Sequence, residues 1–198
     1  MLRPNAVLVH LMDRERKTDV RSIVYTRKEK VMQIDETTRL VKLAKKHDKL
    51  AFAELMQGHM QEMYKVGLAI LMNDEDVADA VSETILNCFE KLNTLREDKY
   101  FKTWMTRILI NNCYKILEVR KRQTGLEEWE EPSVTDEYNV ELKDALASID
   151  EKYRPVITLY YLGEYSTKEI ASMLHIPKST VTTWLQRGRE QLAKYYGG

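Results

Sequence analysis

Residues 166–187 read Ser166-Thr-Lys-Glu-Ile-Ala-Ser-Met-Leu-His-Ile-Pro-Lys-Ser-Thr-Val-Thr-Thr-Trp-Leu-Gln-Arg187, and this stretch decides the fold of its half of the chain. Ser166 and Glu169 have the spacing of a capping box, in which each side chain bonds the backbone N–H of the other's residue and so starts a helix. Pro177 suits the first turn of a second helix. The pattern therefore predicts two helices joined by a tight turn, a helix-turn-helix.

The second helix of this pair is predicted to turn a polar face outward. Tyr165 and Ile170 form a hydrophobic staple around the first helix, Ala171 is small where the helices cross, and Val181 and Leu185 point inward. The opposite face can hydrogen-bond base edges and phosphates in a major groove. We expect on it Lys178, Ser179, Thr180, Thr182, Thr183, Gln186 and Arg187. A plain helical hairpin is the alternative. The capping box, the small residue Ala171, the turn and the polar outer face together favour DNA binding.

Charge is distributed in blocks along the chain. The 198 residues include 31 basic and 31 acidic ones, so the formal net charge is zero. Residues 72–98 hold eight acids and two bases, and residues 123–142 hold seven acids and no base. Residues 101–122 hold six bases and one acid, and residues 177–195 hold four bases and one acid. Two basic segments on predicted helices indicate a nucleic-acid partner that the net charge conceals.

Composition and motifs exclude several function classes. No run approaches the roughly 20 apolar residues of a membrane helix, and no signal-peptide pattern occurs, so we expect a cytoplasmic protein without direct membrane insertion. Cys88 and Cys113 lie singly among apolar residues and are expected to be core thiols. The four histidines are scattered, so we predict no metal site and no cofactor. No nucleophile, base and orienting group can be combined, so no catalytic residue is predicted and we expect no enzyme.

The remaining sequence predicts an all-α fold of two small helical domains joined by a flexible acidic linker. Apolar residues recur at helical spacing over 50–71, 77–92 and 101–122, which places an N-terminal domain at residues 35–122. In the second helix we expect Val77, Val81, Ile85, Cys88, Phe89 and Leu92 to point inward. In the third helix we expect the same of Trp104, Ile108, Leu109, Ile116 and Leu117.

Two further segments differ in amino-acid composition from these helices. Residues 123–140 contain Gly, Pro and many acids and are predicted to be the linker. Fully extended, that linker would reach about 60 Å, on the order of 17 base pairs of duplex. A second helical domain follows at residues 141–198. Residues 1–34 show no sustained period and are predicted to be a weakly ordered extension. Residues 27–30 can be encoded by purine-only codons before Met32, so residues 1–31 are interpreted as a translated leader.

Three stretches together resemble the ECF (extracytoplasmic function) sigma factors of bacterial RNA polymerase, over about residues 45–196. Residues 74–92, with the acidic start Asp-Glu-Asp and the centre Glu-Thr, are similar to the helix of the family that binds core polymerase. Residues 101–115, with Phe-x-x-Trp and Arg-Ile before Asn, are similar to its promoter-melting segment. The helix-turn-helix, with Glu-Ile-Ala and Ile-Pro-x-x-Thr-Val, resembles the module that reads the −35 element.

The resemblance implies a partner for each segment. An acidic helix face suits a basic surface on the polymerase, and the contact residues implied are Asp76, Asp79 and Glu83. At the −10 element, Asn111 corresponds to the position that recognises a flipped base and Asn112 lies beside it, with Lys115, Arg120, Lys121 and Arg122 along the DNA backbone. Trp104 is interpreted as core packing. The implied partners are core RNA polymerase, promoter DNA and an anti-sigma factor, which is often membrane-bound in the family.

A different class of protein fits part of the same pattern. A stand-alone helix-turn-helix regulator would use the N-terminal helices as a dimerisation or ligand module and would bind duplex DNA without polymerase. Two residues also depart from the family. His175 stands where the turn commonly has Gly, although His accepts left-handed backbone better than most residues. Trp184 stands where the family often has Arg, which removes a charge from the recognition helix and leaves the −35 preference open.

Overall fold

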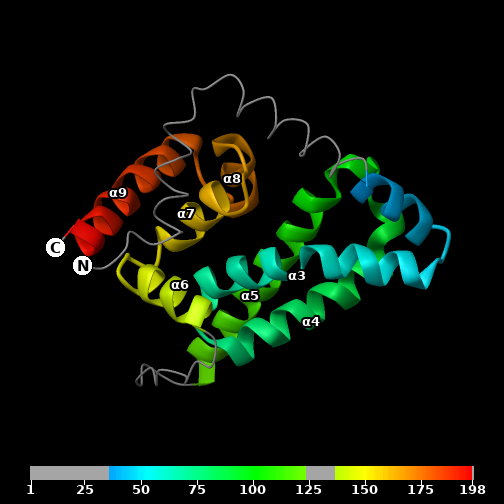
Figure 1. Ribbon diagram of the computed structural model, residues 1–198, viewed down its shortest axis with the longest axis horizontal. Helices are drawn as coiled ribbons and strands as arrows, with labels where there is room; N and C mark the ends of the chain where they lie inside the picture. Colours follow the sequence, from blue (N-terminus) through cyan, green and yellow to red (C-terminus); the bar gives the residue numbers. More distant parts are fainter. Residues whose placement is uncertain (1–35, 124–136, 198) are drawn as a thin grey trace.

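A computed structural model describes residues 36–123 and 137–197 of the chain, and every regular element in those two ranges is a helix (Figure 1). The all-α prediction is confirmed. A helix over 36–44 comes first, and α3 (Lys49–Leu71), α4 (Asp74–Lys91), the short 3-10 turns η1 (Leu92–Thr94) and η2 (Asp98–Tyr100) and α5 (Phe101–Gln123) follow it. The second group consists of α6 (Glu137–Ala147), α7 (Arg154–Tyr161), α8 (Thr167–Leu174) and α9 (Lys178–Gly197).

The N-terminal domain is a bundle in which α3, α4 and α5 pack on one another. Asp48 caps α3 by accepting from the backbone N–H groups of Leu50 and Ala51, and Asn73 caps α4 by accepting from that of Asp76. Apolar residues from all three helices are buried together, among them Leu55, Met63, Leu68, Val77, Cys88, Phe101, Met105 and Leu109. The expected helix spans and the two core thiols are therefore confirmed.

Two predicted inward faces differ from the observed ones. On α5 the deeply buried residues are Phe101, Met105, Leu109, Ile110 and Cys113, whereas Trp104, Ile108, Ile116 and Leu117 are half-buried beside them. On α4, Phe89 is 56% exposed, so the prediction that it points inward is wrong. Cys88 already fills the buried stripe of α4, and the next residue along a helix points about 100° away. Phe89 instead meets the ring of Phe52 edge-on at 5.2 Å.

The C-terminal domain contains the predicted helix-turn-helix in α8 and α9. Ser166 and Glu169 form both halves of the capping box, and Tyr165 and Ile170 of the staple are both buried. His175 ends α8 in the left-handed region with φ 54°, which confirms that the turn accepts this side chain in place of Gly. The inward pair of α9, Val181 and Leu185, is buried with 0% and 6% exposure.

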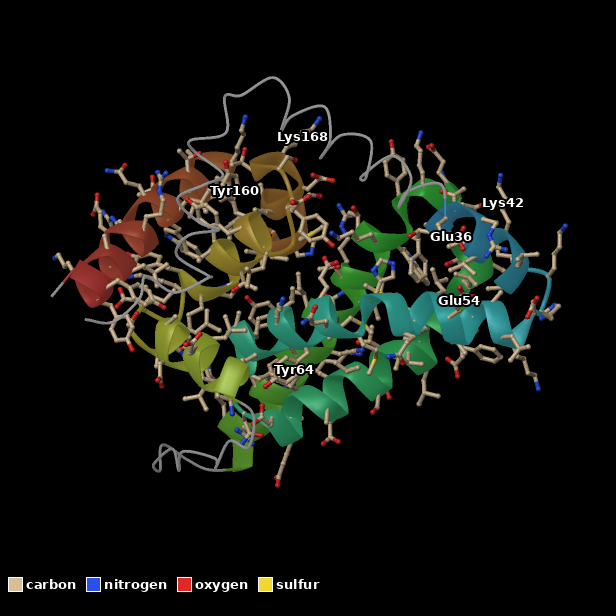
Figure 2. All side chains as sticks on the ribbon, viewed as in Figure 1. Glu36, Lys42, Glu54, Tyr64, Tyr160 and Lys168 are labelled. Carbon is tan, nitrogen blue, oxygen red and sulfur yellow. The ribbon has the colours of Figure 1, made fainter. Side chains whose placement is uncertain are left out.

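The two domains also pack against each other, which the sequence did not predict. Helix α7 lies against α3, and α8 lies against α5 (Figure 1). Charged side chains such as Lys42, Glu54 and Lys168 are exposed on the outside of both domains (Figure 2). The order of the elements therefore matches the prediction, and the seam between the two halves is an additional finding.

The described ranges also shift one boundary. Helix α6 begins at Glu137, so residues 137–140 are helical although the predicted linker included them. The remaining linker residues 124–136 lie outside the described residues, and so does the predicted N-terminal extension with its proposed leader. Thirteen extended residues would reach about 43 Å, less than the reach expected from the longer linker.

Two helical glycines, Gly188 which is buried and Gly58 which is exposed, give a matched test of this packing. A Cβ on Gly188 would lie 2.7 Å from Ile157 Cγ1 and 3.3 Å from Tyr153 Cβ, because α9 crosses α7 there. A Cβ on Gly58 in α3 would meet no atom within 4 Å. We predict that Gly188→Ala lowers the free energy of unfolding by about 1–3 kcal/mol. Gly58→Ala should raise it by about 0.5–1 kcal/mol through helix propensity alone. Urea denaturation followed by circular dichroism measures both changes, and equal signs would contradict the packing of α9 on α7.

Candidate functional site

The polar face of α9 is formed as the sequence predicts, with one exception. Lys178, Ser179, Thr182, Thr183, Gln186 and Arg187 are exposed, and Thr180 is half-buried. The hydroxyls of Thr182 and Thr183 donate to the carbonyls of Lys178 and Ser179 one turn earlier, at 3.1 and 3.0 Å. Their oxygens can therefore still accept a hydrogen bond from a base or from a partner side chain. Buried Val181 and Leu185 hold this face outward against the rest of the domain.

Trp184 and Arg187 lie one turn apart on α9, and both contact Tyr153. Trp184 is half-buried and packs edge-on against Tyr153, with ring centroids 6.1 Å apart. It therefore contributes to the packing of α9 on the start of α7. A hydrogen bond with Tyr153 raises the pKa of Arg187, so the guanidinium keeps its charge. A fixed positive charge suits contact with phosphates or with guanine.

The predicted −10 residues of α5 fall into two groups. Asn111, Lys115, Lys121 and Arg122 are exposed on the outer side of the helix. Asn112 is 4% exposed and donates its side-chain amide to Thr84 Oγ1 at 3.0 Å. A buried amide with its partner inside the bundle cannot reach DNA, so the structure assigns Asn112 to holding α5 against α4. This corrects its predicted role.

Arg120 and Asp76 were predicted to contact different partners, but they contact each other. Arg120 Nη2 lies 2.8 Å from Asp76 Oδ2, and the side chain of Asp76 is only 13% exposed. Burial raises the pKa of the Asp76 carboxyl, and the charge of Arg120 acts in the opposite direction. This pair ties the end of α5 to the start of α4. Asp76 is accordingly less available to a partner protein than the other acids of α4.

The outer face of α4 carries an acidic half and an apolar half. Asp79 and Glu83 are exposed, as the prediction requires. Leu86 and Phe89 continue the same face at helical spacing and are 59% and 56% exposed. Exposed large apolar side chains beside charged ones are typical of protein-binding surfaces. The sequence could have identified Leu86, because it follows Glu83 by three residues and lies outside the inward stripe.

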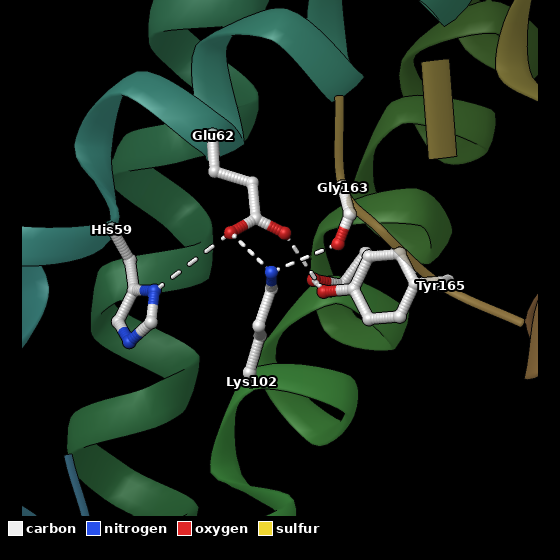
Figure 3. A network of polar contacts seen from close by, with 6 residues as sticks. His59, Glu62, Lys102, Gly163 and Tyr165 are labelled. Atoms are coloured by element: carbon white, nitrogen blue, oxygen red, sulfur yellow. Dashed lines mark hydrogen bonds and ion pairs between the residues drawn. The ribbon is translucent and has the colours of Figure 1, made fainter. Parts of the chain in front are cut away.

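A cluster of polar side chains lies where the two domains meet (Figure 3). Glu62 of α3 accepts from Lys102 Nζ at 3.1 Å and from the Tyr165 hydroxyl at 2.9 Å. Lys102 of α5 also donates to the Gly163 carbonyl at 2.9 Å, and the hydroxyl of Thr106 lies 2.7 Å from that of Tyr165. The ring of Tyr165 lies 5.0 Å from Lys102 Nζ, within cation–π range. Nothing in the sequence pattern pointed to this cluster, because its hydrogen bonds join residues that are 59, 61 and 103 positions apart.

Burial controls the ionisation of this cluster. Burial raises the pKa of the Tyr165 phenol, and the Glu62 carboxylate acts in the same direction, so the hydroxyl stays protonated and donates. Burial lowers the pKa of His59 to about 4, and the positive charge of Lys102 adds to this effect. His59 Nδ1 lies 4.0 Å from Glu62, whose oxygens are already engaged by Lys102 and Tyr165. His59 is therefore neutral at pH 7 and packs beside Phe101.

Comparison with known families matches both halves of the chain. The family model described as Sigma-70 region 2 matches residues 55–124, and the one described as Sigma-70, region 4 matches residues 139–192. Together they cover 124 of the 198 residues. The first match contains α4 and α5, and the second contains the helix-turn-helix of α8 and α9.

Curated relatives match along most of their own length. The chain is 28% identical to the ECF RNA polymerase sigma factor SigW of Bacillus subtilis, over 78% of this chain and 93% of the relative. It is 25% identical to the ECF RNA polymerase sigma-E factor of Salmonella typhimurium, over 77% of this chain and 90% of the relative. It is 23% identical to the RNA polymerase sigma-H factor of Pseudomonas aeruginosa, over 81% and 93%.

Two solved structures share the fold. The structure of CnrH in complex with the cytosolic domain of CnrY matches with a TM-score of 0.62 and 20% identity, over 82% of this chain and 97% of the other. The sigma factor RpoE in complex with the anti-sigma factor NepR, from Bartonella quintana, matches with a TM-score of 0.61 and 18% identity, over 71% and 95%. Among the residues that the structure describes, no helix is both long and apolar enough to cross a membrane.

Proposed function

We infer that the chain, which belongs to the ECF class of the sigma-70 family, is an alternative sigma factor. It binds core RNA polymerase and directs promoter-specific transcription initiation by reading −10 and −35 elements. The observation that carries this function is the order of the two family matches, region 2 on α4 and α5 and region 4 on the helix-turn-helix. A stand-alone regulator would not account for the region 2 match, so that alternative is not favoured.

The division of labour follows the charges of the helices. The exposed acids and apolar residues of α4, namely Asp79, Glu83, Leu86 and Phe89, contact the polymerase. Asn111, Lys115, Lys121 and Arg122 of α5 contact the opened −10 element. The polar face of α9 reads the −35 element in the major groove. Binding both elements through linked domains raises affinity without new contacts.

Partners and location follow from the same function. The protein acts by binding and not by catalysis, in the cytoplasm, where polymerase and promoter DNA are present. Because both solved relatives are complexes with a second protein, and NepR is named an anti-sigma factor, we propose that an anti-sigma factor also binds this chain. That inhibitor would bind region 2 and region 4 together and keep them from polymerase.

Run-off transcription tests the main function. Purified core polymerase should give promoter-dependent transcripts from a promoter library only when this protein is added, because core enzyme lacks its own promoter readout. The measurement is sequencing of the transcript 5′ ends. Specific duplex binding by the protein alone, with no promoter-dependent transcript in an active assay, would favour the stand-alone regulator instead.

The apolar half of the α4 face can be tested separately. Leu86→Gln should weaken binding to core polymerase by roughly tenfold, because it removes an exposed apolar anchor from the contact surface. Its free energy of unfolding should change by less than about 0.5 kcal/mol, since Leu86 is 59% exposed. Val140→Gln is the matched control, because Val140 is 39% exposed and belongs to α6, outside the proposed contact face of α4. Fluorescence anisotropy with labelled protein measures both affinities, and equal affinities would contradict the assignment.

The two DNA-contacting helices should act at different steps. Arg187→Ala is expected to weaken −35 binding by about tenfold, because a bidentate contact to a base or phosphate is lost. Asn111→Ala should instead impair −10 discrimination and strand opening more than initial docking. Gel-shift affinity and permanganate reactivity of the holoenzyme separate the two steps. Exposed Arg96→Ala and Asn93→Ala are controls of the same residue types off the DNA-facing helices. Equal effects of both main variants on both steps would contradict this division.

A further inference from the structure

We propose that the cluster around Glu62 is a clasp that holds the free chain closed and prevents it from engaging both promoter elements, an inference that rests on the proposed function. Three separate segments meet at one carboxylate, because Glu62 of α3 accepts from Lys102 of α5 and from Tyr165 of the α7–α8 turn (Figure 3). Charge-assisted hydrogen bonds of this kind are stronger than neutral ones. The clasp therefore joins region 2 to region 4 directly.

The clasp also occupies part of the basic surface of α5. Lys102 donates to the Gly163 carbonyl at 2.9 Å, and Arg107 donates to the Ser172 hydroxyl of α8 at 2.7 Å. Two of the six bases of α5 thus face the C-terminal domain. On α6, Lys143 pairs with Asp74 at the start of α4 and adds a second tether between the halves. In this closed state Lys102 and Arg107 are bonded to the C-terminal domain. The proposed −10 contacts Asn111, Lys115, Lys121 and Arg122 stay exposed, so closure acts on the distance between the two DNA-binding helices.

The closed arrangement is too short to span a promoter. Asn111 follows Arg107 by four helical residues, about 6 Å along the axis. Lys178 follows Ser172 by six residues, at most about 21 Å of chain. Because Arg107 and Ser172 are in contact, Asn111 and the start of α9 lie within about 40 Å of each other. By their names, the −10 and −35 elements are about 25 base pairs apart, which is about 85 Å of straight duplex.

The interface between the domains contains polar groups that water can satisfy and a groove that side chains do not fill. Tyr165 and Thr106 are buried, with 3% and 1% exposure. When the two domains separate, their hydroxyls and the Glu62 carboxylate can form hydrogen bonds with water instead. Part of the seam is not filled by side chains at all. A groove of about 500 Å³ lies between Ile70, Tyr114 and Leu117 of one domain and Pro155, Ile176 and Trp184 of the other. The packing between the domains is therefore less complete here than in a protein interior, and the clasp adds polar contacts to the apolar ones that hold the closure.

Tyr165→Phe tests the clasp with little other change. The variant keeps the ring in the staple and over Lys102, but it removes the hydroxyl that bonds both Glu62 and Thr106. The closed state then contains polar groups without partners, whereas the open state loses nothing, so the ratio of open to closed should rise about tenfold. Glu62→Gln is the second variant, because it keeps the shape and removes the charge that attracts Lys102. Tyr195→Phe on the outer side of α9 is the matched control.

Energy transfer between dyes measures the opening in the full-length free protein. Cysteines introduced at exposed Met60 and Lys168 lie on opposite sides of the clasp, since they neighbour Glu62 and Tyr165 in the chain. Burial raises the pKa of native Cys88 and Cys113 to about 12, so the dyes react with the introduced thiols. We expect high transfer in the unchanged chain and in Tyr195→Phe, and a larger low-transfer population in Tyr165→Phe and Glu62→Gln.

Binding of the free protein to a duplex carrying both elements completes the test. If only the open state binds, the apparent affinity of Tyr165→Phe rises by up to tenfold, in step with the open fraction. With saturating core polymerase, its transcription should equal that of the unchanged chain. Unchanged transfer in both variants would overturn the clasp, whatever transcription shows. Increased opening without tighter DNA binding would overturn its inhibitory role. Opening together with failed run-off transcription of the unchanged protein would refute the sigma function and leave the clasp standing.

Discussion

The last two turns of α3 are apolar on every side, and the arrangement of the molecule depends on covering them. Residues 66–71, Val-Gly-Leu-Ala-Ile-Leu, are all buried. A helix that is apolar all round must be covered from more than one direction. Helices α4 and α5 cover α3 within the first domain, and α7 of the second domain covers it from another side. This requirement brings the turn before α8 next to α5, where the polar cluster around Glu62 forms.

Polar contacts then determine which functional side chains remain available. Asn112 and Arg120 carry the chemistry expected of DNA contacts, yet Asn112 bonds Thr84 inside the bundle and Arg120 pairs with Asp76. Each arrangement supplies a buried or half-buried polar group with a partner, which such groups require. Asn111, one residue from Asn112, is left exposed. Neighbouring residues of α5 point about 100° apart around the helix axis. The amide of Asn112 is therefore structural, whereas that of Asn111 can recognise a base.

Sequence reasoning was accurate where neighbouring residues decide the outcome. The capping box of Ser166 and Glu169, the left-handed turn at His175 and the inward pair Val181 and Leu185 all depend on residues within one or two turns of each other. The predictions of which helix face is buried were less accurate, because the helical period alone does not say how wide the buried face of a helix is. Phe89 was expected inside and is exposed on the surface that we assign to polymerase. For Trp184 the sequence indicated only the loss of a positive charge, but the structure shows its ring packed against Tyr153.

The sequence by itself determined the helices, their caps, the helix-turn-helix and the family to which the chain belongs, because these features repeat at short and fixed spacings. Only the tertiary structure decided that the two domains touch, that Glu62, Lys102 and Tyr165 share one polar cluster, and that Asp76 pairs with Arg120. Such contacts join residues separated by tens of positions. Their formation depends on how α3 is covered from both sides, which no local pattern specifies.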